Sequence, residues 1–164
     1  METRWKPVSP RHALALIAIS VATILAGCSS LGVRAPADAL TPIEHLNLGI
    51  SYEHAGKLDL ALREYERAAI GAVRSRALTC QGNIFLVREQ WPQAEARYRA
   101  ALELDPHDLL ALNNLAWLLG SQGRSLDEAE GLIRHALTLN PEPRADLEDT
   151  LATVLAAKPP AAGP

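Results

Sequence analysis

Residues 81–101 read QGNIFLVREQWPQAEARYRAA, and this pattern of small and aromatic residues occurs three times along the chain. Gly82 precedes Phe85 by three positions, and Ala94 precedes Tyr98 by four. Such spacings place residues on one face of a helix, so the stretch predicts two helices that approach closely at their small residues. The corresponding residues are Gly49, Tyr52, Ala61, Tyr65 and Ala68 in the preceding copy, and Leu112, Leu115, Ala116, Leu119, Ala129, Ile133 and Ala136 in the following one.

The pattern resembles the tetratricopeptide repeat, which has Trp, Leu-Gly and Tyr on a first helix and Ala and Phe on a second, over about 34 residues. The resemblance implies an all-α fold, a helix-turn-helix solenoid of about three repeats at residues 42–74, 75–108 and 109–143. An apolar face at residues 144–157 predicts a capping helix, which covers the last repeat of such a stack. Residues 158–164, rich in Pro and Ala, are predicted to form a disordered tail. The first repeat departs from the pattern at His45 and Val73, and the third has an insertion near residues 121–125.

Residues 1–27 have the order of a secretory leader, with Arg4, Lys6 and Arg11 before an apolar run over residues 13–26. The run is shorter than the roughly 20 residues of a membrane-spanning helix. It is followed by Gly27-Cys28, and residues 25–28 resemble the lipobox of bacterial lipoproteins. The resemblance implies a signal peptide at residues 1–27, cleavage after Gly27, and a diacylglycerol thioether with an N-acyl group on Cys28. An ordinary leader with a chance cysteine is the alternative.

Ser29, the residue after the cysteine, bears on the location. It is not the Asp that retains such lipoproteins in the inner membrane, so the resemblance implies a lipid-anchored protein of the outer membrane that faces the periplasm. Residues 28–41 would form a lipidated flexible tether, whose part from Ser29 to Thr41 reaches at most roughly 45 Å. Without the leader the charge is near −5 (13 − 18), which does not attract anionic lipid. Membrane contact is therefore expected through the acyl chains.

The face of each first helix that lies opposite its second helix is expected to line a concave groove. Amides recur there, and an amide can both donate to and accept from the backbone of a bound peptide. The predicted groove residues are Asn47, Ile50, Arg76, Asn83, Val87, Asn113, Asn114 and Trp117, and the same face includes Leu46, His54, Thr79, Cys80 and Leu110. Some of the amides could instead bond neighbouring helices; both interpretations remain open for Asn114, and packing competes with binding for Trp117.

Other classes of function find little support in the sequence. Basic residues are scattered, which disfavours nucleic acid as a partner. The histidines have no metal-ligand spacing, and no nucleotide or nucleophile motif is present, so neither a cofactor nor a small-molecule substrate is expected. Cys80 would be a lone thiol once Cys28 is acylated, and a small buried residue is the simpler interpretation than a thiol enzyme.

The sequence thus predicts a membrane-anchored scaffold that binds a protein or peptide partner in the periplasm or outer membrane. It resembles repeat lipoproteins that assist the assembly of pilus, secretion or polysaccharide-export complexes. The alternatives are a regulator of peptidoglycan enzymes and a structural lipoprotein subunit that self-associates through its repeat ends. The groove lacks the Lys and Arg set with which some family members clamp a terminal carboxylate, because Leu46 and Ile50 occupy part of that face.

Overall fold

The computed structural model describes residues 38–139, 142 and 144–159. The predicted leader, Gly27, Cys28 and the tether up to residue 37 lie outside the described residues. Within the described ranges all regular elements are helical, as predicted. They are α2 (Pro42–His54), α3 (Leu58–Ala68), the short 3₁₀ helix η1 (Gly71–Val73), α4 (Arg74–Val87), α5 (Trp91–Leu104), α6 (Leu109–Ser121), α7 (Leu126–Leu139) and α8 (Ala145–Ala157).

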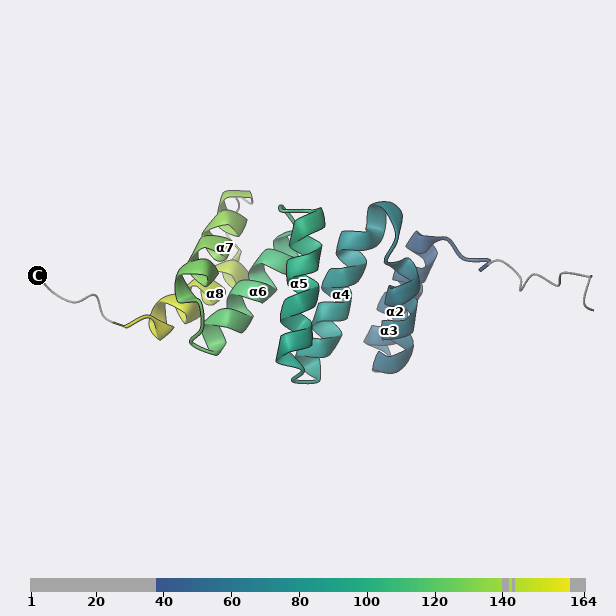
Figure 1. Cartoon of the computed structure of the whole chain (residues 1–164), viewed down its shortest axis with the longest axis horizontal. Helices are drawn as coiled ribbons and strands as arrows, with labels where there is room; N and C mark the ends of the chain where they lie inside the picture. Colours follow the sequence, from purple (N-terminus) through teal and green to yellow (C-terminus); the bar gives the residue numbers. More distant parts are fainter. Residues whose placement is uncertain (1–37, 140–141, 143, 160–164) are drawn as a thin grey trace, which may run out of the picture. The chain divides into compact units, whose positions relative to one another are not determined.

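The helices pack in consecutive pairs that stack side by side (Figure 1). α2 pairs with α3, α4 with α5, and α6 with α7; we call α2, α4, α6 and α8 the first helices and α3, α5 and α7 the second helices. The turns within pairs lie along one edge of the stack, and the turns between pairs lie along the opposite edge (Figure 1). α8 packs on α6 and α7, and no second helix follows it within the described residues. The predicted solenoid of three helix pairs and a capping helix is therefore confirmed.

A glycine in the first helix lets the second helix approach in each of the first two pairs. A Cβ atom on Gly49 would lie 2.5 Å from Cε1 of Tyr65, and one on Gly82 would overlap Cε1 of Tyr98 in the same way. Both tyrosine rings are fully buried. The tyrosine rings therefore occupy the volume that a side chain at the glycine would need. A larger residue at the glycine position would force the tyrosine ring or the second helix to move.

In the third pair the two helices approach each other through different residues. Ala116 stands where the other first helices have glycine, and its second helix presents Ile133 instead of tyrosine. Both residues are fully buried in one cluster. The aliphatic partner needs less room than a ring, so the first helix tolerates a methyl group here.

The turn inside each pair needs a residue with positive φ. Gly56 (φ 70°), Glu89 (φ 57°) and Gly123 (φ 62°) hold this position in the three successive pairs. Glycine adopts the conformation freely, whereas Glu89 does so at the cost that a Cβ atom imposes in the left-handed region. The turn after α4 is thus held by its surroundings rather than by its own residue.

Contacts between pairs use two positions seven residues apart on each first helix. Ala77 and Ile84 on α4, Ala111 and Leu118 on α6, and Leu147 and Val154 on α8 are almost fully buried. α8 therefore continues the register of the other first helices. At Gly120 of α6 a Cβ atom would lie 2.7 Å from Cγ2 of Val154, so α8 also packs closely on the end of α6.

The first pair carries polar residues at these two positions. Glu44 and Ser51 of α2 correspond to Ala77 and Ile84 of α4, and both are exposed. Glu44 closes a capping box with Thr41, whose hydroxyl and backbone N–H lie 2.7 Å from the carboxylate. The hydrogen bonds at Thr41 lower the pKa of Glu44. This end of the described stack therefore has a polar surface, as is expected where no described pair precedes the helix.

Ion pairs hold the end of α8. The Lys158 amine lies 2.7 Å from the Asp127 carboxylate and 2.6 Å from that of Glu130, both on α7. These carboxylates raise the pKa of Lys158. The predicted disordered tail begins at this residue; the structure describes Lys158 and Pro159 of it, and 160–164 lie outside the described part. None of the helices described is long and apolar enough to cross a membrane.

Gly82→Ala is expected to destabilise the fold by about 1–3 kcal/mol, because the added methyl group overlaps the buried Tyr98 ring. Gly131→Ala is the matched control, since Gly131 is exposed within α7 and a Cβ atom there has no neighbour within 4 Å. The control should gain about 0.5–1 kcal/mol from helix propensity. Urea unfolding followed by circular dichroism measures both; equal effects of the two substitutions would contradict the close-approach argument.

Candidate partner-binding groove

The first-helix face, opposite the second helices, exposes several of the side chains that the sequence assigned to a groove. Val87 is 68% exposed and Trp117 is 39% exposed, although both are large and apolar. Asn47 and Arg76 are exposed as well. Ile43, at the helix position of Arg76 and Leu110, is 48% exposed and was not among the predicted groove residues. The sequence could have identified Ile43 as a groove residue, because it is the second residue of the first helix, as Leu110 is in the third repeat.

Two residues assigned to this face by sequence do not lie on it. Leu46 is 2% exposed and belongs to the core around Ala61 and Tyr65. Thr79 is 1% exposed and donates its hydroxyl to the Asp108 carboxylate at 2.8 Å. Helix periodicity alone could not separate these positions from the exposed ones, because the following helix pair covers the rim of the face.

The amides between the second and third pairs bind one another. Asn83 Oδ1 accepts hydrogen bonds from the Tyr98 hydroxyl at 2.9 Å and from Asn114 Nδ2 at 2.8 Å. Asn113 Nδ2 donates to Asn114 Oδ1 at 3.3 Å, and Asn113 Oδ1 is buried without a partner among the described residues. Of the two interpretations left open for Asn114, the structure supports the bond to a neighbouring helix. Asn83 joins α4, α5 and α6 at one atom.

Asn47 shows why one amide stays free. It holds the same helix position in its repeat as Cys80 and Asn114 hold in theirs. Asn114 finds its partner on the preceding pair, whereas no described pair precedes α2. The Asn47 side chain accordingly makes no hydrogen bond within the described part of the chain and is exposed. Ile50, at the position of Asn83, is half-buried against the first core cluster.

Cys80 lies between the first two pairs in surroundings that disfavour a reactive thiol. It is half-buried beside Tyr65, whose hydroxyl donates to Glu53 Oε2 at 2.5 Å. Burial and the nearby Glu53 charge raise the pKa of the Cys80 thiol to about 11. The thiolate, which is the nucleophilic form, is therefore scarce at neutral pH. This supports the interpretation of Cys80 as a packing residue.

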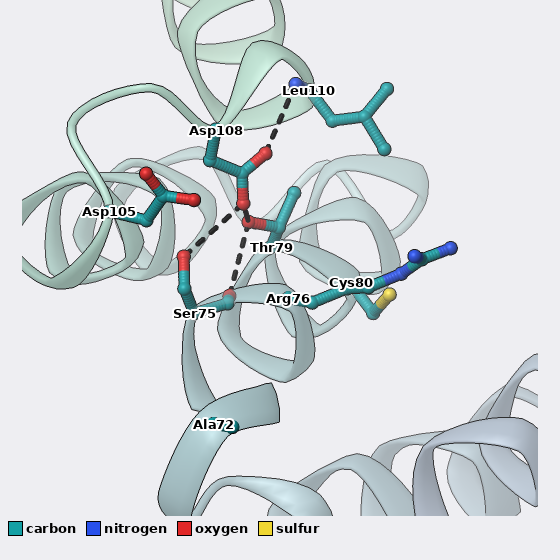
Figure 2. Close-up of a pocket in the computed structure, with 8 residues that line it drawn as sticks. All are labelled: Ala72, Ser75, Arg76, Thr79, Cys80, Asp105, Asp108 and Leu110. Atoms are coloured by element: carbon teal, nitrogen blue, oxygen red, sulfur yellow. Dashed lines mark hydrogen bonds between the residues drawn. The ribbon is translucent and has the colours of Figure 1, made fainter. Parts of the chain in front are cut away.

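A pocket of about 320 Å³ opens where α4 meets α6 (Figure 2). Arg76 and Cys80 of α4 line it together with Leu110 of α6. Asp108 stands at its wall and is fully engaged: it accepts from the Ser75 and Thr79 hydroxyls and, at 3.1 Å, from the backbone N–H groups of Leu110 and Ala111. The remaining surface of the pocket is partly apolar and has the Arg76 guanidinium at its rim.

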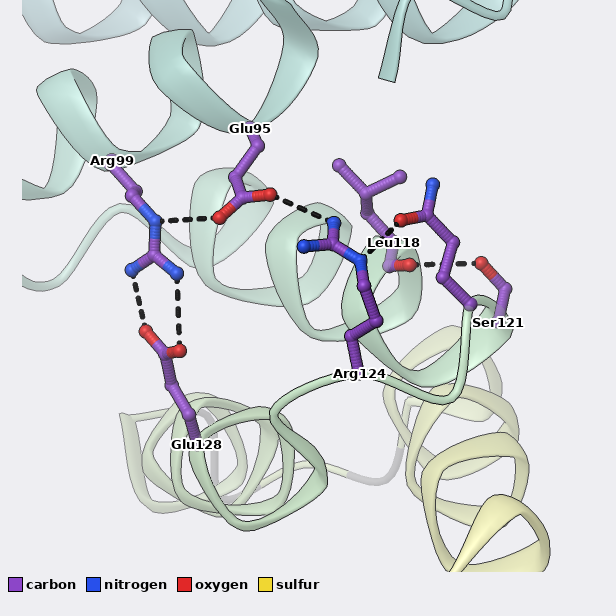
Figure 3. Close-up of polar contacts among 7 residues, drawn as sticks. Glu95, Arg99, Leu118, Ser121, Arg124 and Glu128 are labelled. Atoms are coloured by element: carbon purple, nitrogen blue, oxygen red, sulfur yellow. Dashed lines mark hydrogen bonds and ion pairs between the residues drawn. The ribbon is translucent and has the colours of Figure 1, made fainter. Parts of the chain in front are cut away.

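A network of ion pairs links the second helices α5 and α7 (Figure 3). Arg99 of α5 contacts Glu95 at 3.0 Å and Glu128 of α7 at 2.5 Å, and Arg124 contacts Glu95 at 2.9 Å. The Arg124 bond holds the pKa of Glu95 below its usual value, and Arg99 does the same for Glu128. These ion pairs connect the second helix pair with the third on this side of the stack.

The histidines act in packing and at the surface. His45, which replaces the consensus Trp, is buried with its Nδ1 2.7 Å from Glu64 Oε2, and Glu64 also accepts from Arg67 at 3.0 Å. His107 and His135 make an edge-to-face contact with ring centroids 5.3 Å apart. Among the described residues, no group of three or more His, Cys, Asp and Glu side chains is placed to hold a metal ion.

Asn83→Ala is expected to destabilise the fold by about 1–3 kcal/mol, because it leaves the Tyr98 hydroxyl and the Asn114 amide without their acceptor. Asn47→Ala, on the exposed amide that stands at the helix position of Asn114, should change stability by less than about 0.5 kcal/mol. Thermal unfolding followed by circular dichroism compares the two variants. Equal stability of both would show that the amide bonds between pairs contribute nothing measurable.

Residues 81–142 match the family model of the tetratricopeptide repeat. The fold is similar to the first such domain of Spaghetti (RPAP3) bound to the HSP90 peptide SRMEEVD, at 18% identity and a TM-score of 0.64 over 75% of this chain and 97% of that one. It is also similar to the second domain of human RPAP3 with the HSP70 peptide SGPTIEEVD, at 18% identity and a TM-score of 0.60 over 70% and 98%.

A third similar structure is MamA of AMB-1, at 23% identity and a TM-score of 0.57 over 75% of this chain and 67% of that one. No curated protein matches the chain. At these identities the solved structures bear on the fold alone, while the family match rests on the repeat sequence itself. Together they identify the fold of the helices from Pro42 to Ala157 as a tetratricopeptide-repeat solenoid.

Proposed function

We propose that this chain is a lipid-anchored scaffold of the bacterial envelope, which holds a segment of a partner protein on its first-helix face. The partner would be a periplasmic or outer-membrane protein of a pilus, secretion or polysaccharide-export complex. The acyl chains on Cys28 would fix the domain to the periplasmic side of the outer membrane. The domain itself carries no chemistry in this proposal and acts by bringing proteins together.

The exposure of Trp117 and Val87 on the first-helix face is the observation that carries the proposal. Large apolar side chains left in water on one face of a rigid scaffold are typical of surfaces that another protein covers. Asn47 and Arg76 add exposed hydrogen-bond donors on the same face. An extended or helical segment with apolar side chains and an exposed carbonyl or carboxylate group fits this combination.

The chaperone peptides seen with the two RPAP3 domains end in EEVD, and are therefore acidic. Arg76 is the basic residue that the described first-helix face offers near its pocket, while the neighbouring positions hold Cys80, Leu110 and Ile50. A more apolar partner is therefore favoured here. The amides Asn83 and Asn114 would form the floor beneath that partner, because their hydrogen-bonding atoms are already used between helices.

Self-association through stacked repeat ends is the less favoured alternative. At the end formed by the first pair it would meet a polar surface, because Glu44 and Ser51 are exposed there. Another first helix or second helix stacked there would bury the Glu44 carboxylate, which costs free energy unless a new partner compensates. The first-helix face has no such obstacle.

The groove can be tested by crosslinking the full-length protein in cell envelopes, followed by affinity capture. Wild type is expected to capture a defined partner, and the double variant Val87→Glu with Trp117→Glu is expected to lose it, because charges replace the exposed apolar contacts. Ala96→Glu, on the exposed surface of the second helix α5, is the control and should retain the partner. Retention by the double variant with unchanged helicity would place the binding elsewhere.

The anchor is tested separately by intact mass. Wild type is expected to lack residues 1–27 and to carry the mass of a diacylglycerol and an N-acyl group, because Cys28 supplies the thiol for the thioether. Cys28→Ala should keep the leader or lack the lipid mass. The same acylated species from that variant would rule out Cys28 as the attachment site.

A further inference from the structure

Exposed apolar side chains gather at one edge of the stack. Of the eight large hydrophobic residues exposed among those described, five lie at or just before the starts of first helices, in a turn between pairs, or at the end of the second helix α5. We call this edge, made of residues 40–43, 69–76 and 104–110, the inter-pair edge. Its exposed apolar residues are Leu40 (38%), Ile43 (48%), Ile70 (57%), Leu104 (47%) and Leu110 (46%).

The opposite edge is built differently. The turns within pairs contain Gly56-Lys57, Glu89-Gln90 and Gly123-Arg124, and Val87 is the large apolar residue exposed beside them. Turns in a folded protein are ordinarily polar because they face water. The polar edge follows that rule. The inter-pair edge departs from it at Ile70 in the turn after α3, and in the next pair at Leu104 and Leu110, the helix residues on either side of the turn after α5.

The inter-pair edge is continuous in space, not only similar in sequence. Figure 1 shows the turn after α3 and the turn after α5 along the same side of the stack. The Ser75 hydroxyl at the start of α4 donates to the Ala101 carbonyl of α5 at 3.1 Å and to Asp108 at 3.3 Å. Figure 2 shows the start of α4 meeting the start of α6 at these contacts. Leu104 and Leu110 thus flank a turn that is hydrogen-bonded to the start of α4.

Two arginines at this edge are available to bind phosphate, although Asp105 and Asp108 at the same edge balance their formal charge. Arg74 and Arg76 in the first turn of α4 are exposed, and neither pairs with a carboxylate within the described residues. α4 has no acidic residue in its first turn and no side-chain cap. Of the nearby carboxylates, Asp108 is bound by four donors, and Asp105 accepts from the His107 N–H at 3.0 Å.

The chain also enters the domain at this edge. α2 begins at Pro42, and the first described residue, Asp38, follows Cys28 by ten residues (38 − 28). Ten residues reach at most about 36 Å. A lipid on Cys28 would therefore keep Asp38, where the chain enters this edge, within that distance of the bilayer surface.

We propose that the inter-pair edge rests in the headgroup layer of the phospholipid bilayer, with Ile70, Leu104 and Leu110 at its apolar boundary and Arg74 and Arg76 against lipid phosphates. This inference rests on the proposed lipid anchor, which supplies proximity; the edge supplies the second contact that sets orientation. The first helices then stand upright on the membrane, and the first-helix face opens sideways, parallel to its surface. A partner would approach along the membrane and not from the periplasmic side above.

The experiment uses the full chain in a Cys80→Ser background, reconstituted into vesicles of phosphatidylethanolamine and phosphatidylglycerol. An environment-sensitive fluorophore is placed at Ile70→Cys, at Leu104→Cys, or at the control Val87→Cys, which is similarly exposed on the opposite edge. The labels at 70 and 104 are expected to shift to shorter wavelength and to be quenched by doxyl-labelled lipid several-fold more than the label at 87. Equal quenching at all three positions, or aqueous spectra at all three, overturns the proposal.

A second variant separates lipid from protein as the occupant. With the fluorophore at Leu110→Cys, the pair Ile70→Glu and Leu104→Glu should abolish lipid quenching while helicity is unchanged. Shielding of the label from an aqueous quencher without quenching by doxyl lipid would mean that protein covers the edge, and would overturn the proposal. Intact mass reads the anchor independently: quenched labels on an unacylated chain defeat the anchor alone, and aqueous labels on an acylated chain defeat the edge alone.

Discussion

The distance at which the two helices of a pair can approach controls the whole domain. Gly49 and Gly82 leave room for the Tyr65 and Tyr98 rings, and this places each second helix so that its alanines meet the next first helix. If the pair opened, Ala77 and Ile84 would lose their register against the preceding second helix, and the stack would not continue. A core packed at native density has no empty volume in which such a shift could be accommodated.

The same close approach explains why part of the first-helix face is structural. Tyr98 reaches through the pair until its hydroxyl meets Asn83, and Asn83 then meets Asn114 on the following first helix. The buried hydroxyl must find an acceptor, so the amides at these two positions satisfy the core before any partner arrives. Surface left for recognition is found where no neighbour is in reach, at Asn47, Arg76, Val87 and Trp117.

Periodicity predicted the helix pairs, the small residues at their contacts and α8 as a fourth first helix, because these depend on helical spacings of three and four and on the recurrence of the whole repeat. It did not separate Leu46 and Thr79 from the exposed face, since their burial depends on how neighbouring pairs overlap. The sequence left open a bond from Asn114 to a neighbouring helix but did not name Asn83 as its partner, because the two residues lie on different repeats. Of the exposed apolar residues of the inter-pair edge, Leu110 was assigned to the first-helix face from the sequence, whereas Ile70 was missed because it lies in a turn, which has no helical period.

Gly49 and Gly82 each contact a tyrosine on the next helix along the chain, and these contacts also bear on how the domain folds. Contacts this close in sequence close short loops, and chains dominated by local contacts fold fast. During synthesis, a pair can therefore fold as soon as its own two helices have left the ribosome, before the rest of the chain has been made. Growth would proceed from the first pair towards α8, and the last-formed contacts, between Lys158 and α7, would complete the stack.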